Sequence, residues 1–114
     1  GAGAGYETMR LAALCATLPA AQRAVDDGAI LAWWRSGSDG KPCNGGSGQA
    51  VHVGLVQVKT GPLALCKRGS LHGTSNPSKW RGDRLWAVAM YPPIAFEAKK
   101  CASLKREILA EVPL

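Results

Sequence analysis

A run of turn-forming residues divides this chain into two parts with different patterns. Residues 35 to 49 read RSGSDGKPCNGGSGQ, and Gly, Pro, Ser, Asp and Asn favour turns over helices and strands. We therefore expect this run to be the longest loop of the fold. A helical pattern precedes it and strand patterns follow it, so the sequence predicts helices first and a sheet afterwards.

The N-terminal part carries the pattern of two helices. Apolar residues of the run LAALCATL recur at i, i+3, i+4 and i+7, which predicts a helix from Thr8 to Leu18. Pro19 ends that helix and suits the first turn of a second one. The second helix has a face of small residues that reaches Ala32, and small residues would let this helix lie close to a sheet.

Strand patterns begin after the loop. The run VHVGLVQV, residues 51 to 58, alternates and then shifts phase at Gly54, as a β-bulge would produce, and its alternation turns His52 toward solvent. Turns separate it from LALC, residues 63 to 66, and from RLWAVAM, residues 84 to 90. Pro92 and Pro93 should limit the last of these strands, because proline cannot donate to a ladder.

Two further segments complete the expected elements. Asn76 and Pro77 are a good cap and first position for a helical turn that reaches Trp80. Residues 102 to 112 fit two structures, because helix propensity favours a helix while alternate apolar residues would share one face of a strand.

These patterns predict an α+β fold in which one or two N-terminal helices pack on a mainly antiparallel sheet of four to five strands, placed between residues 51 and 112. The chain has 114 residues, with 46% apolar and 19% charged side chains, so we expect one core and one domain over residues 8–114. Residues 1–7 begin with Gly-Ala-Gly-Ala-Gly, which offers no packing side chains, and are expected to form a flexible lead.

The four cysteines stand far apart in the sequence. Cys43, Cys66 and Cys101, with His72, have the right ligand types for zinc, but their spacing matches no zinc motif, so we expect no metal site and no cofactor. The apolar run before Pro19 is too short for an export signal or a membrane span. We therefore expect free thiols, a cytoplasmic protein and no membrane partner.

The positive charge is concentrated in the second half. The net charge is +6, and residues 1–58 hold four basic and four acidic side chains, whereas residues 59–114 hold ten and four. Clustered cations attract phosphates and acidic surfaces, and cations interleaved with aromatic rings are typical of single-stranded nucleic-acid surfaces. The same pattern fits a solvated sheet face with inward tryptophans. The candidate binding residues are His72, Thr74, Lys67, Arg68, Lys79, Trp80, Arg81, Arg84 and Trp86.

The stretch from Cys66 to Trp86 resembles a group of small phage and bacterial proteins that have no established activity. They share a Cys, a Leu-His-Ala or Leu-His-Gly with Thr, and then Pro, Trp, Gly, an acid and Arg. The matching residues here are Cys66, Leu71, His72, Gly73, Thr74, Pro77, Trp80, Gly82, Asp83, Arg84 and Trp86. The resemblance implies a sheet-rich core, a strand over residues 102–112 and a mobile-element origin, but no function. The basic face predicts a small accessory or interaction domain whose partner is nucleic acid or an acidic protein.

The tetrapeptide Leu71–Thr74 also resembles the His-Gly-Thr opening of ADP-ribosyltransferase folds. In that family the histidine contacts the ribose of NAD, and a later tyrosine and glutamate complete the site. This resemblance implies an alternative, an enzyme acting on a nucleotide-like substrate with His72, Tyr91 and Glu107 as its catalytic residues. A structural role, in which the His72 ring bonds a turn backbone, stays open as well.

Overall fold

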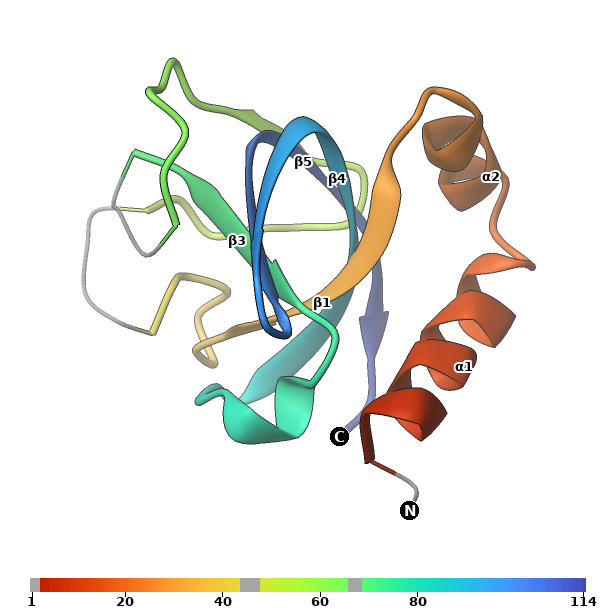
Figure 1. Cartoon of the computed structure of the whole chain (residues 1–114). Helices are drawn as coiled ribbons and strands as arrows, with labels where there is room; N and C mark the ends of the chain where they lie inside the picture. Colours follow the sequence, from red (N-terminus) through yellow and green to blue (C-terminus); the bar gives the residue numbers. More distant parts are fainter. Residues whose placement is uncertain (1–2, 44–47, 66–68) are drawn as a thin grey trace.

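The computed structural model describes residues 3–43, 48–65 and 69–114, with the side chains of residues 3–8 left aside (Figure 1). Two helices precede a five-stranded antiparallel sheet, so the predicted α+β class is confirmed. The elements are α1 (Gly3–Cys15), α2 (Pro19–Asp26), β1 (Ile30–Ser36), β2 (Val56–Val58), β3 (Leu71–Thr74), the 3-10 turn η1 (Pro77–Lys79), β4 (Arg84–Glu97) and β5 (Lys100–Val112).

The sheet closes on itself. Its strand order is β2-β5-β3-β1-β4, and β4 pairs with β5 as well, so β1, β3, β5 and β4 form a ring. β4 and β5 are one long hairpin, paired from Leu85 and Val112 at one end to Glu97 and Lys100 at the other. The opposite edge of β5 pairs first with β3 and then with β2.

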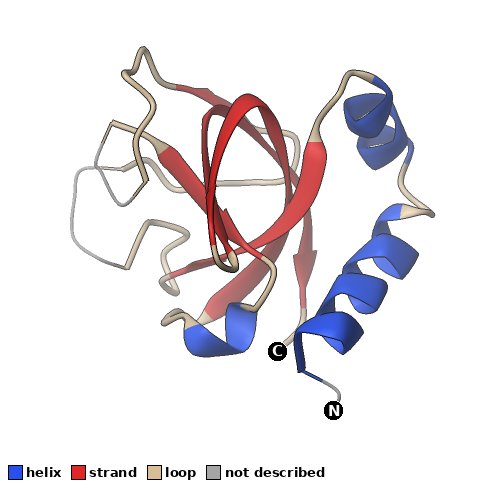
Figure 2. Cartoon of the chain, viewed as in Figure 1, coloured by secondary structure: helices blue, strands red, loops and turns tan. Residues whose placement is uncertain are grey.

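Two apolar cores lie on the two faces of this sheet. Alternate residues of a strand point to opposite faces, so Trp34 enters the ring while its neighbour Trp33 faces the helices. Figure 2 shows both helices along one side of the strands. The interior of the ring is filled by Ala32, Trp34, Val51, Trp86, Val88, Met90, Cys101 and Ile108.

Gly73 of β3 shows how tightly the ring is filled. A Cβ atom on Gly73 would lie 2.9 Å from Ala32 Cβ and 3.3 Å from both Cys101 Sγ and Met90 Sδ. These three side chains come from β1, β5 and β4, so the inward side of Gly73 on β3 has no room for a side chain. Glycine inside a strand is typical of such a close approach.

The sequence prediction missed β1 and misjudged the helix before it. The second helix was expected to reach Ala32, but α2 ends at Asp26, Gly28 adopts a positive φ of 94°, and a strand starts at Ile30. The sheet therefore begins before residue 51. The first helix also differs: α1 runs from Gly3 to Cys15, and so includes residues that were expected to belong to a flexible lead.

The later strands differ from expectation in length. β4 continues beyond Pro92 and Pro93 to Glu97, because its pairing with β5 is interrupted between Tyr91 and Ile94 and the prolines need not donate there. The run over residues 51–58 forms a strand only at Val56–Val58. Residues 63–65 form no strand, and Cys66 lies outside the described residues. β5 covers residues 102–112, as the resemblance implied.

No helix in the described part of the chain combines the length and apolar character needed to cross a membrane.

Candidate functional site

A hollow beside Trp80 combines an apolar wall with a cationic rim. It has a volume of about 240 Å³ and lies between the η1 turn and the tip of the β4–β5 hairpin. Trp80 is half-buried, whereas Lys79, Lys99 and Lys100 are exposed at the rim. The lining residues are Thr74, Asn76, Lys79, Trp80, Ala98, Lys99 and Lys100.

The η1 turn forms one side of the hollow. Pro77 occupies its first turn, as predicted from the sequence, and the Trp80 amide donates to the Pro77 carbonyl over 3.1 Å, so the turn ends at Trp80. Arg35 of β1 donates through Nη1 to the same carbonyl over 3.2 Å. The tryptophan therefore has a fixed place on the surface, with part of its ring packed against the interior core.

The tip of the β4–β5 hairpin forms the other side. Ala98 adopts a positive φ of 51°, the left-handed region that short hairpin turns need. The Lys99 carbonyl accepts from Thr74 Oγ1 over 3.0 Å and from the Ser75 amide over 2.9 Å. These bonds join the end of β3 to the hairpin tip, so the two sides of the hollow are held together.

Three of the sequence-predicted binding residues, Thr74, Lys79 and Trp80, line this hollow. Arg81, the next residue after Trp80, is exposed. Sequence reasoning missed Lys99 and Lys100, because it ended the preceding strand at the proline pair and so did not anticipate the hairpin. Two adjacent lysines between two strand patterns were the available signal. Lys67 and Arg68, also predicted as binding residues, lie outside the described residues.

Trp86 does not belong to the surface, which corrects its prediction as a binding residue. The ring is 2% exposed in the interior of the sheet, and its Nε1 donates to Ser36 Oγ over 2.9 Å. Thr74 is also 2% exposed. Its hydroxyl donates to the Lys99 carbonyl at the hairpin tip and accepts from the backbone amide of Asn76. Arg84 is half-buried and forms a two-point ion pair with Glu111.

The residues suggested by the enzyme alternative are not all brought together. Tyr91 donates its hydroxyl hydrogen to Glu107 over 2.9 Å, and burial, followed by this bond and the Glu107 charge, raises the pKa of Tyr91 to about 12. His72 instead pairs with Ala102, five positions before Glu107 on β5. At about 3.3 Å per residue, this places His72 roughly 16 Å from Glu107 along the strand.

His72 is half-buried on β3. Burial is the main cause that lowers its pKa, and the positive charges of Arg106 and Lys100 lower it further. The imidazole is therefore neutral at neutral pH. His52, the weaker candidate from the sequence, is exposed as predicted.

Arg106 is the buried residue that sequence reasoning overlooked. It is 2% exposed and lies 4.3 Å over the ring of Trp34. Nη1 donates to the His72 carbonyl over 2.7 Å, while Nε and Nη2 both donate to Gln57 Oε1 over 3.0 and 2.6 Å. Burial lowers the pKa of Arg106 to about 9, which leaves it charged at neutral pH. This side chain joins β2, β3 and β5.

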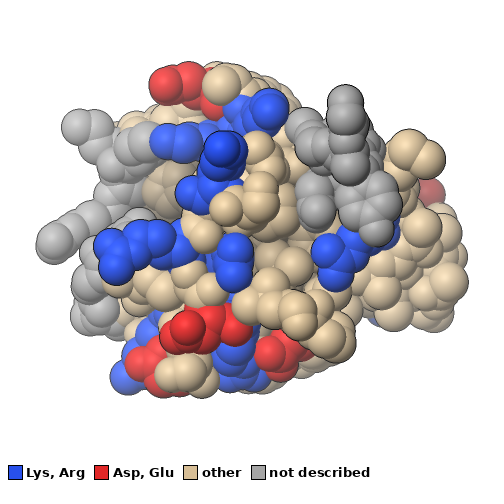
Figure 3. Space-filling view, turned by 90° about the horizontal axis from the view of Figure 1, so that it is seen from below, with Lys and Arg blue, Asp and Glu red and all other residues tan. Residues whose placement is uncertain are grey.

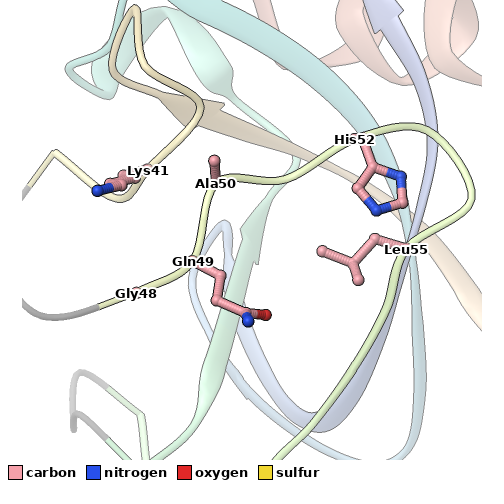
Figure 4. Close-up of a pocket in the computed structure, with 6 residues that line it drawn as sticks. All are labelled: Lys41, Gly48, Gln49, Ala50, His52 and Leu55. Atoms are coloured by element: carbon pink, nitrogen blue, oxygen red, sulfur yellow. The ribbon is translucent and has the colours of Figure 1, made fainter.

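A second, larger hollow of about 550 Å³ lies on a loop surface (Figure 4). It is lined by Lys41, Gly48, Gln49, Ala50, His52 and Leu55. In Figure 4, Lys41 lies at one end and His52 beside Leu55 at the other, and the polar ends of these side chains point in different directions. Among the described residues that line this hollow, the polar groups do not converge as they do in small-molecule sites.

Figure 3 shows the molecule from below, the side on which η1 lies in Figure 1. Lysine and arginine side chains spread across this face, and acidic side chains lie nearer its edges.

No protein-family model matches this chain, and no curated protein or solved structure matches it significantly.

Proposed function

We propose that this domain binds nucleic acid through the surface formed by Lys79, Trp80, Lys99 and Lys100, called here the Trp80 surface. The observation that carries the proposal is a half-buried tryptophan lining a hollow whose rim holds three lysines. Nucleic-acid binding draws most of its strength from lysine and arginine contacts to phosphates, and exposed aromatic rings add stacking to bases.

The charges of this surface are available to a partner. Among the described residues, none of Lys79, Lys99 and Lys100 forms an ion pair, whereas Arg84 is neutralised by Glu111. With a net charge of +6 on the chain, the surface would attract a polyanion over a distance of about 10 Å at ordinary ionic strength.

The aromatic ring favours nucleic acid over an acidic protein as the partner. Carboxylates would be attracted by the lysines alone, but they would leave the apolar wall beside Trp80 without a matching group. A base has both a flat apolar face and polar edges. The free cysteines Cys15, Cys43 and Cys101 favour a reducing compartment, so we place this activity in the cytoplasm. The proposed origin of this accessory domain in a mobile element rests on the sequence resemblance alone.

Fluorescence anisotropy with labelled oligonucleotides tests the proposal. We expect binding at low salt, with an affinity that falls steeply as salt rises, because each neutralised phosphate releases a condensed counterion. Lys99→Glu and Lys100→Glu should weaken binding and reduce the salt slope. Lys59→Glu is the matched control, because it changes the net charge equally but lies after β2, where its amide donates to the Leu104 carbonyl, four positions from Lys100 on β5.

Two outcomes would overturn the proposal. One is the absence of binding to any single or double strand at low salt, which would leave acidic proteins as the partner class. The other is an equal loss of affinity in Lys59→Glu and Lys100→Glu, which would mean that net charge alone drives the association and that the Trp80 surface has no special part in it.

A further inference from the structure

We infer that the hollow beside Trp80 receives one unpaired base, so that the domain selects single strands over duplexes. This inference rests on the proposed function and adds to it the form of nucleic acid that is bound. Charge alone cannot make this distinction, because duplexes and single strands both carry phosphates. The selection would come from the hollow itself.

The wall of the hollow is suited to a base rather than to a phosphate. The Trp80 ring and the Ala98 methyl group are apolar, and the Thr74 hydroxyl is already engaged with the Lys99 carbonyl and the Asn76 amide. A phosphate placed against this wall would lose its hydration without gaining donors there. A base would gain stacking on Trp80 and leave the phosphates to the lysines.

The rim can hold the backbone on both sides of such a base. Lys79 belongs to the η1 turn, whereas Lys99 and Lys100 belong to the hairpin tip, so cations flank the hollow from two elements. Asn76 adds a polar group at the same place. Its Oδ1 accepts from Ser78 Oγ over 2.8 Å, which orients the amide so that its NH₂ group can serve a base edge.

The hollow is also formed in advance of binding. The bonds from Thr74 and Ser75 to the Lys99 carbonyl connect its two sides, and the positive φ of Ala98 fixes the direction of the hairpin turn. A preformed site loses less entropy when it binds than one that must be ordered. Bases inside a duplex have both faces stacked, so only an unpaired base can enter it.

The test compares variants of Trp80 on four probes: the 12-mers of deoxythymidine and of uridine, and DNA and RNA hairpin duplexes of equal phosphate number. Trp80→Leu keeps an apolar side chain without a π-face, and Trp80→Phe keeps a ring. We expect Trp80→Leu to weaken single-strand binding roughly 10- to 100-fold, with an unchanged salt slope and an unchanged duplex affinity. Trp80→Phe should lose less. The two 12-mers tell whether DNA or RNA is preferred.

The outcomes separate this inference from the proposed function. If Trp80→Leu weakens both forms equally or neither, while Lys100→Glu weakens both, the base site is wrong and the basic surface stands. If the unaltered protein binds none of the four probes, the proposed function itself fails. Thermal unfolding of each variant shows whether it is folded, and Trp80→Phe keeps the test valid if loss of the ring disturbs the core that Trp80 contacts.

Discussion

Arg84 and Arg106 occupy neighbouring strands and make the same aromatic contact in opposite surroundings. The guanidinium of Arg84 lies 4.7 Å over the ring of Trp86, and that of Arg106 lies 4.3 Å over the ring of Trp34. The Arg84 side chain is 34% exposed and has a carboxylate partner in Glu111. Arg106 is 2% exposed.

The difference lies in what satisfies each charge. Arg84 has an acid and the solvent, and ion pairs of this kind add little to stability. Arg106 has neutral acceptors, the side-chain amide of Gln57 and the carbonyl of His72, which hold its donors in fixed directions. A buried charge whose partner is removed cannot turn to water, so the loss of one acceptor is costly. An arginine side chain therefore forms a surface ion pair at position 84, whereas at position 106 it connects three strands in the interior.

The largest effect is expected from removing the Gln57 acceptor. Gln57→Leu leaves two nitrogen atoms of the buried Arg106 without their amide oxygen, and we expect it to lower the free energy of unfolding by about 2 to 4 kcal/mol. Urea denaturation measures this loss. The double variant Gln57→Leu with Arg106→Met removes the charge as well and should recover part of the stability. A double variant less stable than Gln57→Leu would contradict this account of Arg106.

The second-largest effect is expected in the pH dependence of stability, through His72. Its pKa is lowered by burial and then by the charges of Arg106 and Lys100. As the pH falls through the ordinary pKa of histidine, the unfolded chain therefore binds a proton before the folded chain does. The free energy of unfolding decreases from that pH downward. We expect the melting temperature of His72→Gln to depend less on pH over this interval than that of the unaltered protein.

The control for this measurement is His52→Gln, which alters an exposed imidazole on another surface. It should keep the acid dependence of the unaltered protein. Melting curves collected between pH 7 and pH 5 would show the difference. If both histidine variants retained the full dependence, the acid sensitivity would originate elsewhere and the lowered pKa of His72 would be refuted as its cause.

The smallest effect is expected at the exposed pair. The bond from Arg84 lowers the pKa of Glu111, so its contribution is present above the ordinary glutamate range and disappears as pH falls through the lowered value. Glu111→Gln should lower the melting temperature slightly, by much less than Gln57→Leu does, and the difference should vanish in 1 M salt because exposed charges are screened. A loss that persisted in high salt would mean that the two arginines are more alike than their exposure indicates.

Local patterns in the sequence predicted much of this fold. The helix entered through Pro19 and the turn at Pro77 follow from a few neighbouring residues, and both are confirmed. His52 is exposed as expected, although the strand that was expected to turn it outward covers only Val56–Val58. β1 could not be found in this way, because its side chains are buried on both faces of the sheet, Trp33 on one and Trp34 on the other. Its sequence therefore shows no alternation of polar and apolar residues.

The missed parts of the site depend on contacts between distant residues. The position of Lys99 and Lys100 beside Trp80 requires β4 to continue past its prolines, which only the interrupted pairing with β5 permits. The burial of Arg106 requires the ring to close around it, and its acceptors come from β2 and β3. The two adjacent lysines between strand patterns are the only local sign of the hairpin, and nothing in the sequence beside Arg106 marks its burial.

β5 follows every other described element in the chain, yet β2, β3 and β4 all pair with it. As the chain is synthesised, the ring cannot close until this strand has left the ribosome. Until then β4 lacks its hairpin partner, and interior residues such as Trp86 and Val88 lack part of their cover. Pairings between distant segments form slowly, and uncovered strands invite association with other chains. The protein is therefore most exposed to aggregation during the interval before β5 has been synthesised.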